Sequence, residues 1–214
     1  MPLIIVPTSH VAEESLERVK NTIERFKPDV IAVELDIHRF ILLEEKNKKS
    51  TDLRSSGFLN FAIYTLMKKL QIRLGKKTGI FPGSEMLLAI KIAEEKGIDV
   101  EFIDRDIRIT LFKLQTIPIK EKIKLILFLL FGFSFSFKFD LKKIPPQDIV
   151  DKTVETLRRN FPCIYRILVT ERDSYMAERI RSLMKTYKRV LVFVGAGHKK
   201  GLETLLFKEP QRPS

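Results

Sequence analysis

The sequence predicts an α/β fold in which a mainly parallel central sheet is flanked by helices and carries an α-helical insertion. Two observations lead to this fold class. Four short apolar runs of strand length are separated by segments with helical periodicity, which is the order of elements in α/β proteins. The last run, at 189–194, is apolar at nearly every position, as expected of a parallel strand buried on both faces.

The N-terminal part of the chain has the spacing of a β-α-β unit. We expect three elements there, which are a strand at 2–9, a helix at 13–26 and a strand at 30–33. Pro28 stands just past the end of that helix, where a chain cannot continue helically. A basic amphipathic helix is expected next, at 58–74, because its apolar residues share one stripe.

The following pair of predicted elements is a helix at 85–96 and a strand at 98–103. Ser84 suits the N-cap of this helix, and Gly97 suits the position just after its end, where glycine is favoured. The pair repeats the helix-then-strand order of the N-terminal unit, so the same parallel sheet is expected to continue through it.

A long helical region separates the third strand from the fourth. Helical character dominates from about 107 to 187 and is interrupted near Pro145-Pro146 and Pro162. We interpret this region as an insertion within a single domain that covers residues 1–214. After the fourth strand, Gly195 and Gly197 permit a tight turn into a last helix.

Composition indicates one folded globular domain. The chain has 214 residues, of which 44% are hydrophobic and 31% charged. Cys163 is the one cysteine, which excludes an intrachain disulfide and fits a reducing compartment. The first residues lack a basic lead and a cleavage site, so we interpret them as a strand and expect a cytoplasmic protein.

The net charge of +12 favours an anionic partner. No nucleic-acid-binding motif accompanies the basic residues, so nucleic acid is not the expected partner. Residues 125–137 are apolar and Phe-rich between two lysines, but a helix of that length spans roughly 20 Å, short of the ~30 Å of a bilayer core. Two interpretations stay open, a buried helix or oligomer interface and a helix lying on a membrane surface.

Chemically capable side chains follow the four apolar runs where each run ends. In an open parallel sheet, ligands bind beyond the carboxyl ends of the strands, so these residues are expected to gather at one edge. They are His10, Glu34, Asp36, Asp104, Arg105, Asp106 and His198.

Histidines and acidic residues at these ends suit metal binding or acid–base chemistry. His10 and His198 are two of three histidines in the chain, and neutral imidazole is both a metal ligand and a general base. Glu34 and Asp36 share a face if the strand continues through them, and would then bind a divalent ion or supply an acid and a base. The alternative is that Asp36 caps the following helix and Glu34 is solvated.

Arginines beside acidic residues have a similar pair of interpretations. Arg105 could pair with a carboxylate or hold an anionic group of the substrate, and Asp106 could cap a helix that begins at Ile107. Arg172 lies between Glu171 and Asp173 on a predicted helix, where ordinary surface charge is the alternative.

Several of these segments resemble the TraB/PrgY family of pheromone-shutdown proteins, within a superfamily that also includes Tiki metalloproteases, GumN-like proteins and haem-binding ChaN-like proteins. The matching segments lie in family order along nearly the whole chain. They are TSHV around His10, PDVIAVELD ending at Asp36, PGSEMLLAI from Pro82, IDRDIRITL from Ile103, EKIKL from Glu121, LVTERDSYMA from Leu168 and VGAGHKKGL from Val194.

The resemblance implies a metal-dependent, hydrolase-like site built from paired Gly-x-x-His motifs and acidic residues. The second motif is intact from Gly195 to His198, whereas the first has Pro7 in the place of its glycine. Many members of the family carry membrane helices after this domain, and this sequence ends at Ser214 without them.

The leading hypothesis is a metal-dependent hydrolase that acts on a peptide or a related amide or ester. His10, Glu34 and His198 would hold a divalent metal, which lowers the pKa of bound water. Glu34 or Asp36 would take the proton of that water. The developing oxyanion would be stabilised by Arg105 or Arg172, with Asp106 nearby.

A second hypothesis is a non-enzymatic protein that sequesters a hydrophobic peptide or similar ligand near a membrane. The Phe-rich stretch at 125–137 and the altered first motif favour it. The two hypotheses differ in turnover, because only the first predicts that substrate is cleaved.

Overall fold

The computed structural model of the chain describes residues 2–9, 13–44, 83–131 and 146–207. It has a four-stranded, all-parallel sheet with strand order β1-β4-β2-β3. The strands are β1 (Leu3–Thr8), β2 (Val30–Val33), β3 (Asp99–Phe102) and β4 (Val190–Gly195). The predicted α/β class with a parallel central sheet is therefore confirmed.

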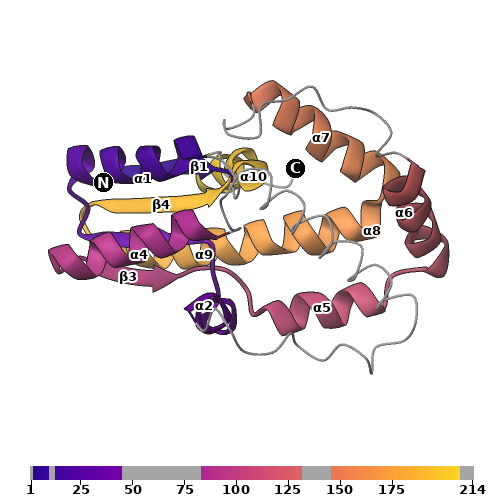
Figure 1. Cartoon of the computed structure of the whole chain (residues 1–214), viewed down its shortest axis with the longest axis horizontal. Coiled ribbons are helices and arrows are strands. Elements are labelled where there is room, and N and C mark those ends of the chain that lie inside the picture. The colour runs from indigo at the N-terminus through magenta and orange to yellow at the C-terminus, as the bar shows by residue number, and fades with distance from the viewer. Residues whose placement is uncertain (1, 10–12, 45–82, 132–145, 208–214) are drawn as a thin grey trace, which may run out of the picture.

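Helices connect the strands and extend the fold beyond them. The helices are α1 (Glu13–Phe26), α2 (Ile37–Glu44), α4 (Ser84–Lys96), α5 (Ile107–Gln115), α6 (Ile119–Phe131), α7 (Gln147–Asn160), α8 (Pro162–Tyr165), the π-helix η3 (Arg166–Thr170), α9 (Glu171–Thr186) and α10 (Ala196–Phe207). Figure 1 shows the sheet in one half of the molecule and α5 to α8 in the other, with β3 and β4 pointing toward that helical half.

The two faces of the sheet bury two separate apolar layers, as the two-residue period of a strand requires. On one face, Ile31 of β2 and Phe193 of β4 pack with residues of α1 and α4. On the other face, Ala32 and Val192 pack with residues of α9 and α10. Because both faces are covered, the central strands are apolar at every position. The apolar run therefore marks the strand, and the predicted bounds of β2 at 30–33 are confirmed.

The ladder of the sheet continues past the ends of the strands and fixes the residues that follow them. The backbone N–H of Glu34 donates to Phe193 O at 3.0 Å, and that of Asp104 donates to Leu35 O at 3.2 Å. Glu34 and Asp104 are thereby held at the carboxyl edge of the sheet, next to the end of β4.

One predicted cap is wrong and another is confirmed. Ser84 was expected to cap α4, but the cap is Gly83, whose backbone has φ 93°, a conformation that glycine adopts without a Cβ clash. Ser84 is instead the first helical residue. Gly97 ends the helix in the left-handed region, with φ 66°, and its N–H binds the last carbonyls as predicted.

Helices fill the predicted insertion between β3 and β4, and breaks fall at the prolines. Pro146 precedes α7, and Pro162 opens α8 at the first helical position, where proline is tolerated. The helix predicted at 58–74 lies outside the described residues, as does the part of the Phe-rich stretch after Phe131. β4 passes directly into α10, so Gly197 lies inside that helix rather than in a turn.

Candidate functional site

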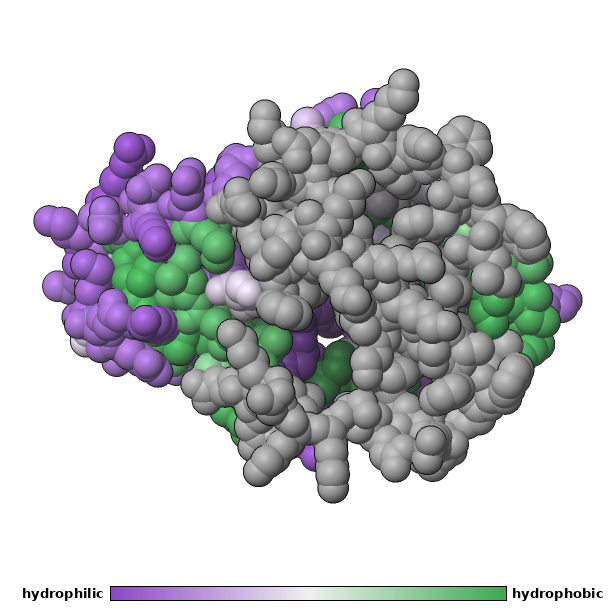
Figure 2. Space-filling model, in the orientation of Figure 1, coloured by the Kyte–Doolittle hydropathy of each residue, from purple (hydrophilic) through white to green (hydrophobic). Residues whose placement is uncertain are grey.

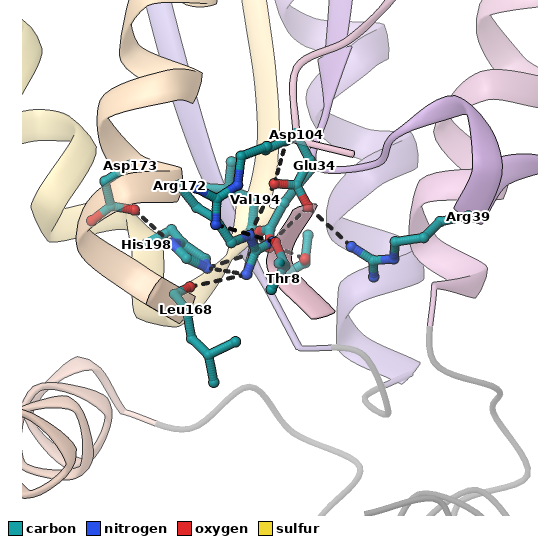
Figure 3. A network of polar contacts seen from close by, with 12 residues as sticks. Thr8, Glu34, Arg39, Asp104, Leu168, Arg172, Asp173, Val194 and His198 are labelled. Atoms are coloured by element: carbon teal, nitrogen blue, oxygen red, sulfur yellow. Dashed lines mark hydrogen bonds and ion pairs between the residues drawn. The ribbon is translucent and has the colours of Figure 1, made fainter. Parts of the chain in front are cut away.

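A buried polar cluster lies at the carboxyl edge of the sheet, and Arg172 is at its centre (Figure 3). Arg172 is the second residue of α9, and it contacts Glu34, which follows β2, and Asp104, which follows β3. Nη2 of Arg172 donates to an oxygen of Glu34 and, at 2.7 Å, to Oδ2 of Asp104. Nε donates to Oδ1 of Asp104 at 2.9 Å. One guanidinium therefore joins the ends of two neighbouring strands.

The remaining nitrogen of this guanidinium faces the helix and a histidine. Nη1 of Arg172 donates to Leu168 O at 3.1 Å and lies 3.1 Å from Nε2 of His198. Leu168 belongs to η3, and a π-helix shifts the register of its carbonyls relative to an α-helix. Burial alone would lower the pKa of Arg172, but Glu34 and Asp104 outweigh it and raise that pKa, so the group stays charged.

His198 is held from its other side by Asp173. Nδ1 of His198 lies 2.5 Å from Oδ1 of Asp173, and both residues are buried. Burial disfavours the imidazolium, but the charge of Glu34 and the hydrogen bond to Asp173 outweigh it and raise the pKa of His198. Burial has the opposite effect on the carboxyl group of Asp173, whose pKa it raises. Nε2 of His198 also lies 3.4 Å from an oxygen of Glu34.

Gly201 explains how Asp173 can approach α10. A Cβ at residue 201 would lie 2.0 Å from Oδ2 of Asp173, which is closer than any real contact. A side chain there would push Asp173 away from His198. The glycine one turn after His198 therefore has a steric reason, which is to admit the carboxylate.

Glu34 is fixed by the backbone as well as by Arg172. One of its oxygens accepts the N–H of Gly195 at 2.6 Å, at the end of β4. Asp104 has a second cation, since Nη1 of Arg39 on α2 lies 3.1 Å from its Oδ2. Glu34 and Asp104 are 3% and 6% exposed, so two guanidinium groups compensate carboxylates that water does not reach.

A cavity of about 610 Å³, open to solvent, is lined in part by Asp173. Its walls come from α7, from η3 and the start of α9, and from α10, and they include Asp173, Gly197 and Gly201. Thr170 and Thr204 also line it. The cavity is large enough for a small ligand beside the Asp173–His198 pair.

The structure brings together three of the predicted site residues, which are Glu34, Arg172 and His198. It places the side chains of Asp36, Arg105 and Asp106 elsewhere. His10, the third predicted metal ligand, lies outside the described residues.

Asp36 and Asp106 both cap helices. Oδ1 of Asp36 accepts the N–H groups of His38 and Arg39 at the start of α2. Asp106 accepts the N–H of Arg108 at 2.8 Å and also binds its guanidinium, and these hydrogen bonds lower the pKa of Asp106 to about 2. The strand ends at Val33, so Asp36 does not share a strand face with Glu34. Glu34, which the capping alternative left in solvent, is buried.

Arg105 forms a second network of polar contacts, separate from the cluster around Arg172. Its Nη1 donates to Glu171 at 2.8 Å, and its Nη2 donates to the hydroxyl of Thr110 and to Ile167 O in η3. Glu171 also binds Lys113 at 2.6 Å. The two networks meet at η3, whose carbonyls receive one guanidinium from each.

Two acidic residues of the cluster were absent from the predicted set of catalytic and metal residues. Asp104 lies among the polar strand ends, and its place directly before Arg105 was the available signal. Asp173 is 25 residues from His198 in sequence, and only the alternation Glu-Arg-Asp marked it. Successive residues of a helix point about 100° apart. Helical periodicity therefore does not predict that Arg172 and Asp173, which are consecutive, both contact His198.

The donor atoms of Glu34 and His198 are engaged by other groups of the cluster, and His10, the third predicted metal ligand, lies outside the described residues. Nδ1 of His198 is occupied by Asp173, and Nε2 faces the guanidinium of Arg172. The oxygens of Glu34 are bound by Arg172 and by the N–H of Gly195. Within the described part of the chain, no group of three or more His, Cys, Asp or Glu side chains is arranged to hold a metal.

Comparison with known proteins assigns a family. A model described as the TraB/PrgY/gumN family matches residues 2–208. Uncharacterized protein MJ1365 of Methanocaldococcus jannaschii is 37% identical over 214 residues, which cover 96% of this chain and 53% of that protein. TraB domain-containing proteins of Mus musculus and Homo sapiens are 25% and 24% identical, over 93% of this chain and 61% of each relative. The chain thus spans between half and two thirds of the length of these relatives.

Proposed function

The chain belongs to the TraB/PrgY/gumN family, and we propose that it is a hydrolase that cleaves peptides or related amides or esters at the edge of its sheet. The observation that carries this proposal is the buried pair of Asp173 and His198 beside the guanidinium of Arg172. A histidine oriented by a carboxylate and placed next to a fixed cation is an arrangement suited to attack by water on a carbonyl group.

His198 would act as the general base. The hydrogen bond from Nδ1 to Asp173 orients the ring and supports the positive charge that forms when Nε2 takes a proton from water. The raised pKa of His198 makes its neutral form a stronger base. Its side chain is 10% exposed, and a water bound at Nε2 would take the place of the contact with Nη1 of Arg172.

Arg172 would stabilise the negative charge that develops on the carbonyl oxygen. One N–H of Nη1 points at Nε2 of His198, 3.1 Å away, and once water takes its place at Nε2 this N–H would be free to donate to the carbonyl oxygen. The bonds to Glu34 and Asp104 fix the guanidinium before substrate arrives, and such preorganisation lowers the cost of reaching the transition state. The oxygen of the water would bond to the carbonyl carbon, and His198 would then return the proton from Nε2 to the leaving nitrogen or oxygen as its bond to that carbon breaks.

Turnover by matched histidine variants tests the proposal. The full chain would be incubated with a library of short peptides and esters, and products followed by mass spectrometry. His198→Ala and Asp173→Asn are expected to lower turnover at least about 100-fold, the usual contribution of a general base. His38→Ala is the control, because the His38 side chain is 41% exposed and does not contact the cluster. Equal turnover in all three variants would refute the role of His198.

A second candidate function is ligand sequestration without cleavage. The observation that favours it is the number of large apolar side chains left exposed on α5 and α6, such as Phe112 at 66% and Ile119 at 58%. Such side chains suit a hydrophobic peptide better than a polar substrate. Tight binding of an apolar peptide by wild-type protein, with no product formed from any library member, would support this candidate over the hydrolase.

A further inference from the structure

Helix α6 presents an exposed apolar stripe with lysines along one side of it. Ile119, Ile123 and Leu127 follow one another at four-residue intervals and are 58%, 48% and 49% exposed. Residues at this spacing lie on one face of a helix, and Lys120 and Lys124 occupy the adjacent face. The ammonium of Lys124 donates to O and Oδ1 of Asn160, at 3.0 and 3.2 Å. Figure 2 shows hydrophobic residues gathered at the end of the molecule where Figure 1 places α6. We call the five residues the α6 face.

The opposite side of α6 is anchored, so the α6 face cannot turn inward. Leu125 packs against the buried cluster that contains Phe161 and Ile164. Glu121 accepts the N–H of Ile164 at 2.9 Å, and the buried Lys122 donates to Gln115 O at 2.7 Å. These contacts hold the helix in one rotation about its axis, with the apolar stripe directed at solvent.

We infer that the α6 face is a docking surface for a membrane that contains anionic lipids. The apolar stripe would enter the boundary between headgroups and acyl chains, while Lys120 contacts the headgroup phosphates and Lys124, held by Asn160, adds its positive charge near them. The inference is independent of the proposed hydrolase activity, because none of these side chains belongs to the cluster around Arg172.

Charge selects a membrane over a second copy of the chain as the occupant. The chain carries a net charge of +12, and two copies meeting through their α6 faces would bring Lys120 and Lys124 of each copy together. An anionic surface instead attracts both the lysines and the chain as a whole. Apolar side chains next to basic ones are the pattern of a helix that lies in the plane of a membrane surface.

None of the helices in the described part of the chain is long and apolar enough to cross a bilayer. The inference therefore requires only that α6 lie at the surface. Its 13 residues correspond to roughly 20 Å of helix along the membrane plane.

Co-sedimentation of the full chain with lipid vesicles tests the inference. Wild-type protein is expected to bind vesicles of phosphatidylcholine mixed with phosphatidylglycerol, to bind phosphatidylcholine alone much more weakly, and to be released by salt. Ile123→Asp should raise the half-saturating lipid concentration about ten-fold or more. The change removes an aliphatic side chain that the membrane would bury and adds a negative charge that anionic lipids repel. Lys120→Glu should raise it about five-fold or more.

Two control variants make the same chemical changes away from the α6 face. Ile41→Asp alters an isoleucine of α2 that is 43% exposed, and Lys185→Glu alters an exposed lysine at the far end of α9. Both should bind vesicles like wild type, and thermal melting should confirm that all four variants are folded.

Either of two results would overturn the inference. The first is a wild-type protein that fails to bind the anionic vesicles at low salt, or that binds them no better than Ile123→Asp does. The second is a lipid-free dimer, measured by analytical ultracentrifugation, that Ile123→Asp abolishes, because this would assign the α6 face to a second copy of the chain.

Discussion

Arg172 and Asp104 form a two-pronged ion pair, with Nε 2.9 Å from Oδ1 and Nη2 2.7 Å from Oδ2. This geometry matches the planar fork of a guanidinium to the two oxygens of a carboxylate, which lysine cannot do. The pair connects the start of α9 to the end of β3. It therefore contributes both to the stability of the fold and to the arrangement of the candidate site.

Arg172→Ala should destabilise the protein by about 3–5 kcal/mol, because it leaves the buried carboxylates of Glu34 and Asp104 without their shared cation. Chemical denaturation measures this change. Arg179→Ala is the matched control on the same helix, since its ion pair with Glu101 is exposed and should be worth less than about 1 kcal/mol. Equal losses in the two variants would contradict the structural role of Arg172.

Arg105→Ala should destabilise less than Arg172→Ala does. Glu171, the acidic partner of Arg105, keeps its 2.6 Å contact with Lys113, and its side chain is 25% exposed, so it is not left as a buried unpaired charge. The comparison is made by denaturing both variants under identical conditions. A larger loss in Arg105→Ala would show that the contacts with Thr110 and Ile167 carry more of the stability.

Asp106→Ala should lower the free energy of unfolding by about 1 kcal/mol, the usual value of a lost N-cap, and Asp106→Asn should lose less because asparagine also caps. The pKa of Asp106 is depressed from 3.8 to about 2, so its charge stabilises the fold above the ordinary pKa. That contribution is lost as pH falls toward 2. A wild-type advantage over Asp106→Asn that stayed undiminished as the pH fell from 5 to 2 would contradict the assignment.

The pH dependence of turnover tests the state of His198. A general base must be neutral, so activity should rise with pH through the pKa of His198, with a midpoint above the ordinary 6.5. Asp173→Asn removes a hydrogen bond that raises this pKa, so the midpoint should move to lower pH in the residual activity. A midpoint that does not move in Asp173→Asn would show that another group controls the profile.

Chelation separates the metal-free scheme from the metal site predicted from sequence. Because Glu34 and His198 are engaged by Arg172, Gly195 and Asp173, we expect turnover to survive dialysis against a chelator. Elemental analysis of protein purified without chelator is the companion measurement. Loss of turnover that a divalent ion restores would instead support a metal held by His10, Glu34 and His198.

The strand ends were predictable because a single physical rule places them. β2 is apolar from Val30 to Val33 and is bounded by acidic residues, so both its limits and the position of Glu34 at the sheet edge follow from the sequence. The partner of Glu34 did not follow. Arg172 comes from a helix 138 residues later, and its rotation depends on the π-helix before it, which the sequence pattern does not indicate.

The sequence did not decide whether Asp36 and Asp106 are site residues or helix caps. The residues after β2 and β3 are similar, and in each case two interpretations were available, a site residue or a helix cap. Asp36 and Asp106 became caps because the strands end before them and a helix begins at the next residue. A shift of one or two residues in the end of the strand decides whether the acidic residue belongs to the site or caps the helix. Such boundaries depend on tertiary packing.

The absence of a side chain at Gly201 has a consequence for the wider family. A Cβ at residue 201 would overlap Oδ2 of Asp173, so the residue type at position 201 limits the residue type at position 173. Homologues with alanine or serine at position 201 should have a residue shorter than aspartate at position 173. Such homologues would lack the carboxylate that contacts His198. Joint variation at two positions would thus separate members that retain this carboxylate–imidazole pair from those that have abandoned it, from sequence alone.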